Sequence, residues 1–164
     1  MSYIVVPDIV ITIFAYLHII SAMGWLGGAI LFTSAVGPGL RGMSPAAGLE
    51  FFAMAVPRLS WYFLLVATST VIFGPFLLLT ISDYSPSVYF GMATGLTAYL
   101  VMLTDFRLFG RISRMAKEIM KSGQSGPPPA EYLKTLRVGR ISTLATVLLL
   151  VATLMFMVYS GFPF

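Results

Sequence analysis

The stretch IVITIFAYLHIISAMGWLGG, residues 9–28, decides the fold of this chain. An apolar run of about 20 residues is long enough to cross the hydrocarbon core of a bilayer as one helix. His18, the only histidine in the sequence, lies near the middle of this run. An ionisable side chain at membrane depth is costly, and such residues usually face the bundle interior and serve a function. Because imidazole is the commonest metal ligand in proteins, this helix carries a candidate ligand.

The composition indicates the same class of protein. Hydrophobic residues make up 58% of the 164 residues and charged residues 10%, whereas a typical soluble domain is about 25% charged. These values indicate an integral membrane protein whose residues 1–164 form a single helical domain. The sequence has no cysteine, which excludes disulfides, zinc–thiolate sites, iron–sulfur clusters and thioether-linked haem.

The apolar runs predict an all-α fold, a four-helix bundle in the membrane. Residues 37–39, Gly-Pro-Gly, are expected to end the first span, and Pro75 is expected to kink the second. Ser44 as N-cap and Pro45 at the first helical position predict a short interfacial helix between the first two spans. The predicted spans cover about residues 9–36, 59–81, 88–109 and 141–159.

The loop charges predict the orientation of the bundle. One basic loop joins the third and fourth spans, and another, with Arg41 and Arg58, joins the first two. The turn near Asp83 and both termini carry no lysine or arginine. Since cytoplasmic loops are enriched in these residues, we expect both basic loops in the cytoplasm, both termini outside and a location in the plasma membrane. This placement also accounts for the net charge of +4 without nucleic acid as a partner.

Small and aromatic side chains accompany His18 on its helix. Ser21 and Trp25 follow at positions that share its face, and this combination leaves room for a flat cofactor. Gly24 and Gly28 form a small-xxx-small pair that permits close approach of another helix, including the first span of a second copy of the chain. His18 itself is interpreted as a metal or haem ligand, with a structural hydrogen bond and a proton relay as the alternatives.

Residues outside the first span complete the predicted site. Opposite His18 we expect either a methionine, with Met92 as the candidate, or an open position, because a thioether serves both as a haem axial ligand and as a soft copper ligand. Arg58 or Arg140 is expected to hold a haem propionate. Asp105, at the cytoplasmic end of the third span, is interpreted as an interfacial residue that pairs with a nearby arginine.

A motif in the first span and its exit resembles a known superfamily. Its residues are His18-x6-Trp25-x-Gly27-Gly28, then Pro38 and Pro57-Arg58. They resemble the copper resistance protein D (CopD) membrane domain and the HemJ-type protoporphyrinogen oxidases. The span layout extends the resemblance over most of the chain. It implies a four-helix membrane bundle, often oligomeric, that in HemJ-like members binds haem b through the first-helix histidine. HemJ-like proteins also carry an intramembrane lysine in the third span, where residues 89–96 of this chain are uncharged.

The sequence therefore predicts a haem b-binding integral membrane protein with a redox or electron-transfer role and His18 as axial ligand. Its reaction, electron relay or oxidation of a porphyrinogen or quinol, and its redox partner are left open. Two alternatives stand beside this prediction. One is a copper-handling membrane protein that uses His18 and methionines, and the other is a non-catalytic subunit of a larger membrane redox complex. The expected partners are the lipid bilayer and a second copy of the chain, bound through the first span.

Overall fold

The computed structural model describes residues 8–78, 85–123 and 127–159. All of the regular structure within these ranges is helical, which confirms the all-α class. Four helical segments are long and apolar enough to cross a membrane, as expected of a four-span bundle.

The helices follow one another with short connections. The first span begins as α1, passes through a π-helical turn, η1, and continues as the short α2. Each of the other spans is a single unbroken helix. The bounds are α1 Asp8–Leu31, η1 Phe32–Val36, α2 Gly37–Arg41, α3 Pro45–Leu78, α4 Pro86–Lys121 and α5 Ala130–Tyr159.

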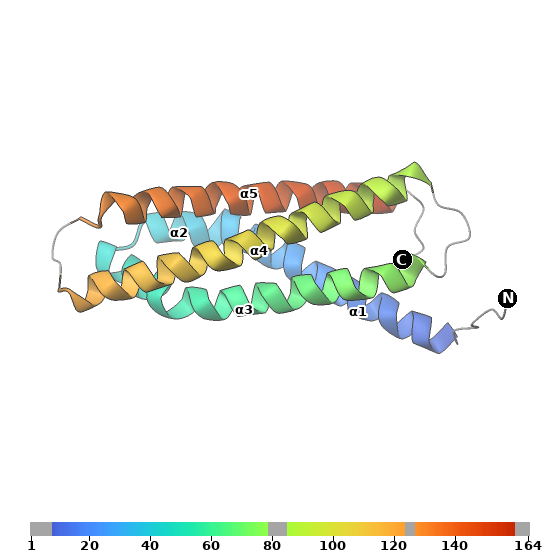
Figure 1. Ribbon diagram of the computed structural model, residues 1–164, viewed down its shortest axis with the longest axis horizontal. Coiled ribbons are helices and arrows are strands. Elements are labelled where there is room, and N and C mark those ends of the chain that lie inside the picture. The colour runs from blue at the N-terminus through green and yellow to red at the C-terminus, as the bar shows by residue number, and fades with distance from the viewer. Residues whose placement is uncertain (1–7, 79–84, 124–126, 160–164) are drawn as a thin grey trace.

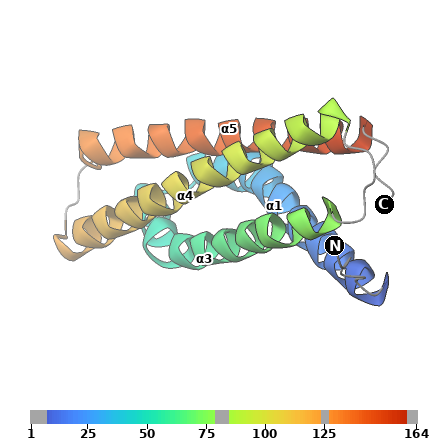
Figure 2. The same ribbon diagram turned by 45° about the vertical axis from the view of Figure 1, so that its right-hand side comes forward.

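Helices α3 and α4 make the most extensive contacts in the bundle. In Figure 1, α3, α4 and α5 run along the long axis of the molecule, and α1 crosses them obliquely. Helix α4 packs on both α3 and α5, whereas α1 packs mainly on α3 and to a lesser extent on α5. The start of α1 and the end of α5 lie at the same end of the bundle, as Figure 2 also shows.

The first span continues past the Gly-Pro-Gly segment at which it was predicted to end. Pro38 lies in the first turn of α2, where a missing N–H does least harm to a helix. In the turn before it, the backbone N–H of Gly37 donates to the carbonyl oxygen of Phe32, a π-helical bond. The wider π turn thus takes the chain into α2 without ending the helix.

The predicted separate interfacial helix is wrong, because residues 45–52 are the first turns of α3. Ser44 does cap this helix, since its Oγ accepts a hydrogen bond of 3.3 Å from the N–H of Ala47. Pro57 lies inside α3 and cannot donate to the carbonyl of Ala53 four residues earlier. The hydroxyl of Ser113 on α4 lies 3.4 Å from that oxygen and takes the place of the missing donor. This contact allows α3 to run unbroken through Pro57.

Helices α4 and α5 also extend well beyond the predicted spans 88–109 and 141–159. Their basic ends remain helical because the apolar sides pack on each other and on the first turns of α3. Buried residues of this cluster are Ala53, Ile112, Ala116, Ile119 and Tyr132.

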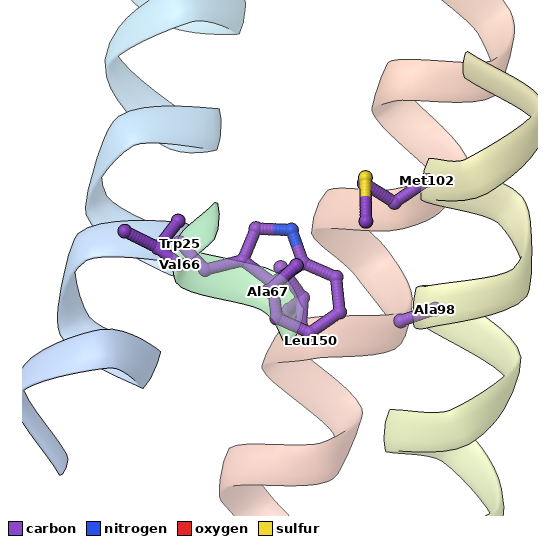
Figure 3. Close-up of a cluster of buried hydrophobic side chains, with 6 residues drawn as sticks. All are labelled: Trp25, Val66, Ala67, Ala98, Met102 and Leu150. Atoms are coloured by element: carbon purple, nitrogen blue, oxygen red, sulfur yellow. The ribbon is translucent and has the colours of Figure 1, made fainter. Parts of the chain in front are cut away.

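The main core lies near the middle of the bundle. Trp25 is 2% exposed and reaches from α1 toward the other helices. Figure 3 shows its indole among residues of α3, α4 and α5, with the ring nitrogen on the side of Met102. The buried members of this core cluster are Trp25, Val66, Ala67, Ala98, Met102 and Leu150.

Gly24 and Gly28 serve the contact between α1 and α3 within the chain. A Cβ added at Gly28 would lie 2.9 Å from a ring carbon of Phe63, and one at Gly24 would lie 3.0 Å from the hydroxyl of Tyr62. The glycine face that was expected to admit a second copy of the chain is therefore already covered by α3. Gly27 is different, since a Cβ there meets nothing within 4 Å.

We predict that Gly28→Ala lowers the free energy of unfolding by about 1–3 kcal/mol, because the added methyl group must displace the Phe63 ring. Gly27→Ala is the matched control and should leave stability unchanged or slightly raised. Unfolding of the detergent-solubilised protein, followed by circular dichroism, measures both. Equal losses in the two variants would contradict the α1–α3 packing described here.

Candidate functional site

His18 lies on the side of α1 that packs against α3, and its side chain is 9% exposed. Its Nδ1 lies 2.9 Å from the backbone oxygen of Thr70 on α3. A carbonyl oxygen only accepts hydrogen bonds, so in the neutral imidazole Nδ1 carries the proton and donates it. Nε2 is then the ring nitrogen with a free lone pair. Metal-ligating histidines are commonly oriented in this way, by a hydrogen bond from the other ring nitrogen to a carbonyl.

Nε2 of His18 has no hydrogen-bond partner among residues 8–78, 85–123 and 127–159, where the hydrogen bond from Nδ1 to Thr70 is the one found for this ring. The lone pair of Nε2 is therefore not used by a hydrogen bond within the described part of the chain.

Thr70 and Gly74 of α3 lie against the imidazole ring and form what we call the seat of His18. The sequence analysis predicted neither residue. A Cβ added at Gly74 would lie 3.1 Å from Cε1 and 3.2 Å from Nδ1 of His18. These distances are tighter than ordinary van der Waals contact, so any other residue at this position would push against the ring. Thr70 offers only its backbone oxygen to His18, because its hydroxyl donates to the carbonyl of Val66. No side-chain signature of this contact exists in the sequence.

The two other predicted residues of the first span lie in different surroundings. Ser21 is partly buried on α1, one turn beyond His18. Trp25 is enclosed in the core, with its ring edge-on to Tyr99 at 6.5 Å and 86° between the ring planes. The indole therefore packs inside the bundle, and the Thr70 carbonyl and Gly74 form the seat of His18.

Met92 and Arg58 are not brought to the seat of His18. Met92 is 40% exposed and lies on α4, whereas the main neighbour of α1 is α3. Arg58 is exposed on α3, twelve residues before Thr70, which corresponds to about 18 Å along a helix. It borders a surface groove together with Lys117 and Lys121 of α4.

Asp105 forms a second site, which sequence reasoning also missed. Its side chain is 8% exposed and lines a cavity of about 60 Å³ in the bundle. The predicted pairing with an arginine is wrong, because the salt bridge found in the described part of the chain joins Arg111 to Glu131. Ser142 and Thr146 of α5 lie beside the carboxylate, while its Oδ1 has no partner among the described residues. A buried carboxylate at membrane depth marks a candidate functional group.

The fold and the two sites define a class: an all-α, multi-pass membrane protein with four candidate spans and with His18 and Asp105 buried between its helices. Comparisons with protein-family models, with curated proteins and with solved structures find no match to this chain. The resemblance to the CopD and HemJ proteins therefore stays a prediction from the first-span motif.

We predict that Asp105→Asn raises the free energy of unfolding by about 1–3 kcal/mol at pH 8, because it removes a buried charge without a counter-charge and keeps the side-chain shape. Unfolding in detergent without added amines measures the change. Glu118→Gln, an exposed carboxylate on the same helix, is the matched control and should change stability little. A clear loss of stability in Asp105→Asn would show that the carboxylate has a stabilising partner.

Proposed function

We propose that this chain is a haem-binding integral membrane protein with a redox role, in which Nε2 of His18 would hold the haem iron. The observation that carries the proposal is the hydrogen bond from Nδ1 of His18 to the Thr70 carbonyl oxygen, 2.9 Å long. It fixes the ring orientation and leaves Nε2 as the lone-pair nitrogen, the arrangement expected of a ligating histidine. The first-span motif, with its resemblance to haem-binding HemJ-like proteins, supports haem over other groups.

The residues around His18 fit this role through their chemistry. Thr70 and Gly74 would fix the imidazole ring on its Nδ1 side, and Nε2 of His18 would hold the iron. Haem b bound there would supply a one-electron redox couple. The cavity beside Asp105 is not part of the proposed haem site, because its volume of about 60 Å³ is far below the roughly 300–1,000 Å³ of cofactor sites.

The proposal assigns no second protein ligand to the iron. Met92, on α4, is not seated beside His18. A copper site receives no added support, because the methionines of the outer half are exposed on different helices, with Met23 at 69% and Met155 at 67% exposure. A soft metal site needs thioethers that converge on the metal.

We further propose that the basic end of the bundle faces the cytoplasm. Arg58, Lys117 and Lys121 gather at this end of α3 and α4. The connection between α3 and α4, at the opposite end, carries no lysine or arginine. This asymmetry is the one that the positive-inside rule describes.

The oxidised and dithionite-reduced visible spectra of the purified protein test the haem proposal. We expect a Soret band and α band in the wild type after haem supplementation, and their loss in His18→Ala. Gly74→Ala should lower haem occupancy by about tenfold, because its Cβ pushes against the imidazole ring. Gly27→Ala is the control and should keep the wild-type spectrum, since a Cβ there meets nothing within 4 Å. A colourless wild type contradicts the proposal, and metal analysis then separates copper handling from a structural subunit.

Cysteine labelling tests the orientation, because the natural chain contains no cysteine. A membrane-impermeant maleimide applied to intact cells should label Ser85→Cys, at the start of α4, and should not label Ser122→Cys, just after its end. Permeabilised cells should show labelling of both variants. The reverse pattern in intact cells would place the basic end outside.

A further inference from the structure

The cavity beside Asp105 lies where all of the spans meet, and it is independent of the haem proposal. The residues that line it carry carboxylate, hydroxyl, thioether and aromatic side chains. The lining residues come from α1 and η1 (Trp25, Ala29, Phe32), from α3 (Val56, Leu59, Ser60, Phe63), from α4 (Met102, Asp105, Phe106, Phe109) and from α5 (Thr143, Thr146).

The carboxylate of Asp105 has no ion-pair partner among the described residues. Asp105 is 8% exposed, Ser142 and Thr146 lie beside its carboxylate, and its enclosed Oδ1 has no hydrogen-bond partner in the described ranges. None of the lining residues is basic. An uncompensated charge in such surroundings costs several kcal/mol, so the site favours a ligand that is cationic and donates hydrogen bonds.

The remaining polar atoms of the wall also accept hydrogen bonds. The hydroxyl of Thr143 donates to the carbonyl oxygen of Gly139 at 2.9 Å, so the lone pairs of its oxygen remain for a ligand. Ser60 on α3 contributes a further hydroxyl. The polar part of the cavity is therefore complementary to a group with several N–H donors.

The aromatic part of the wall favours the same charge. Trp25, Phe32, Phe63, Phe106 and Phe109 all border the cavity. The faces of aromatic rings attract cations, Trp most strongly, and the attraction grows when the site is dry. A metal cation would instead require more oxygen ligands than Asp105 and the hydroxyls offer. The combination favours an ammonium group over a hard metal ion.

The first span is reshaped where it borders this cavity. The π-helical turn η1 begins at Phe32, whose ring packs edge-on against Phe109 at 6.1 Å and 80°. π-helical turns in α-helices often occur at functional sites. The widened turn lies beside the cavity and sets the position of a wall residue.

We propose that the cavity lined by Asp105, Trp25 and the hydroxyls of Ser60 and Thr143 binds a small ammonium group. The ligand is an ammonium ion or the head of a short primary amine. Asp105 is its counter-ion, the hydroxyl oxygens accept its N–H groups, and the aromatic rings cover its remaining surface. A fully methylated ammonium has no N–H group to donate to these oxygens, so the site favours an ion that keeps its N–H groups.

Fluorescence of Trp25 tests the proposal directly. The chain has two tryptophans, and Trp61 is 65% exposed, so Trp61→Phe makes Trp25 the single reporter. The detergent-purified variant is titrated at constant ionic strength with ammonium, methylammonium, tetramethylammonium and sodium chlorides. We expect a saturable change in emission with ammonium or methylammonium and none with tetramethylammonium or sodium. The affinities for ammonium and methylammonium are then compared. Tighter binding of ammonium indicates the free ion as the ligand, and tighter binding of methylammonium indicates the head of an amine.

Substitutions in the Trp61→Phe background locate the site. Asp105→Asn should weaken binding by about tenfold or more, the loss expected when a charged hydrogen-bond partner is removed. Glu118→Gln is the matched control and should bind as the parent does. The proposal is overturned if no chloride gives a saturable change in the parent, if sodium or tetramethylammonium binds as well as ammonium, or if Asp105→Asn keeps the parental affinity. The titration of the Trp61→Phe parent tests the ammonium-binding proposal even if a further variant fails to fold.

Discussion

The constraint on which this structure depends is that polar groups in an apolar phase must find partners inside the protein. The backbone groups of the long helices satisfy this constraint through the hydrogen bonds within each helix. Most threonine hydroxyls meet it by donating to the carbonyl of their own helix four residues earlier, as Thr70, Thr97 and Thr143 do. Even the bond lost at Pro57 is replaced, because Ser113 of α4 reaches the freed oxygen of Ala53. Against this background, the ionisable side chains His18 and Asp105 are conspicuous because each keeps one atom without a partner in the described residues.

These two side chains form separate sites at different depths. His18 is held by Thr70 and Gly74 in the half of α3 near its C-terminal end. The Asp105 cavity includes Ser60 of the same helix, ten residues before Thr70, or about 15 Å along the axis. His18 would offer a lone pair to a metal under one proposal and Asp105 a negative charge to a cation under the other, so either proposal can fail without the other.

The sequence was sufficient to predict the class of fold, because four long apolar runs leave few alternatives to a helical membrane bundle. Helix bounds were less predictable. The second span was expected to begin near residue 59, whereas α3 runs through Pro57, and Ser113 lies 3.4 Å from the carbonyl oxygen that this proline leaves without a donor. Likewise, the basic segment after residue 109 extends α4 because Ile112 and Ala116 pack in a cluster with Tyr132 of α5.

The site was only partly predictable for a similar reason. His18 was recognisable as the single intramembrane histidine, but its partners are a backbone carbonyl and a glycine, which have no side-chain signature. Asp105 was interpreted as interfacial because the third span was expected to end soon after it. The structure shows that Asp105 shares a helix face with Met102 and Ile112, three residues before it and seven after, which are both buried.

The central claim is that His18 donates from Nδ1 to the Thr70 carbonyl and keeps Nε2 free as a ligand. A single histidine makes this directly measurable by ¹⁵N solid-state NMR of the histidine-labelled protein in bilayers without haem. The account predicts a protonated Nδ1 and an unprotonated Nε2 in the neutral ring, with the Nε2 resonance shifted on addition of haem. A neutral ring protonated at Nε2 would contradict it, since Nδ1 could then not donate to Thr70.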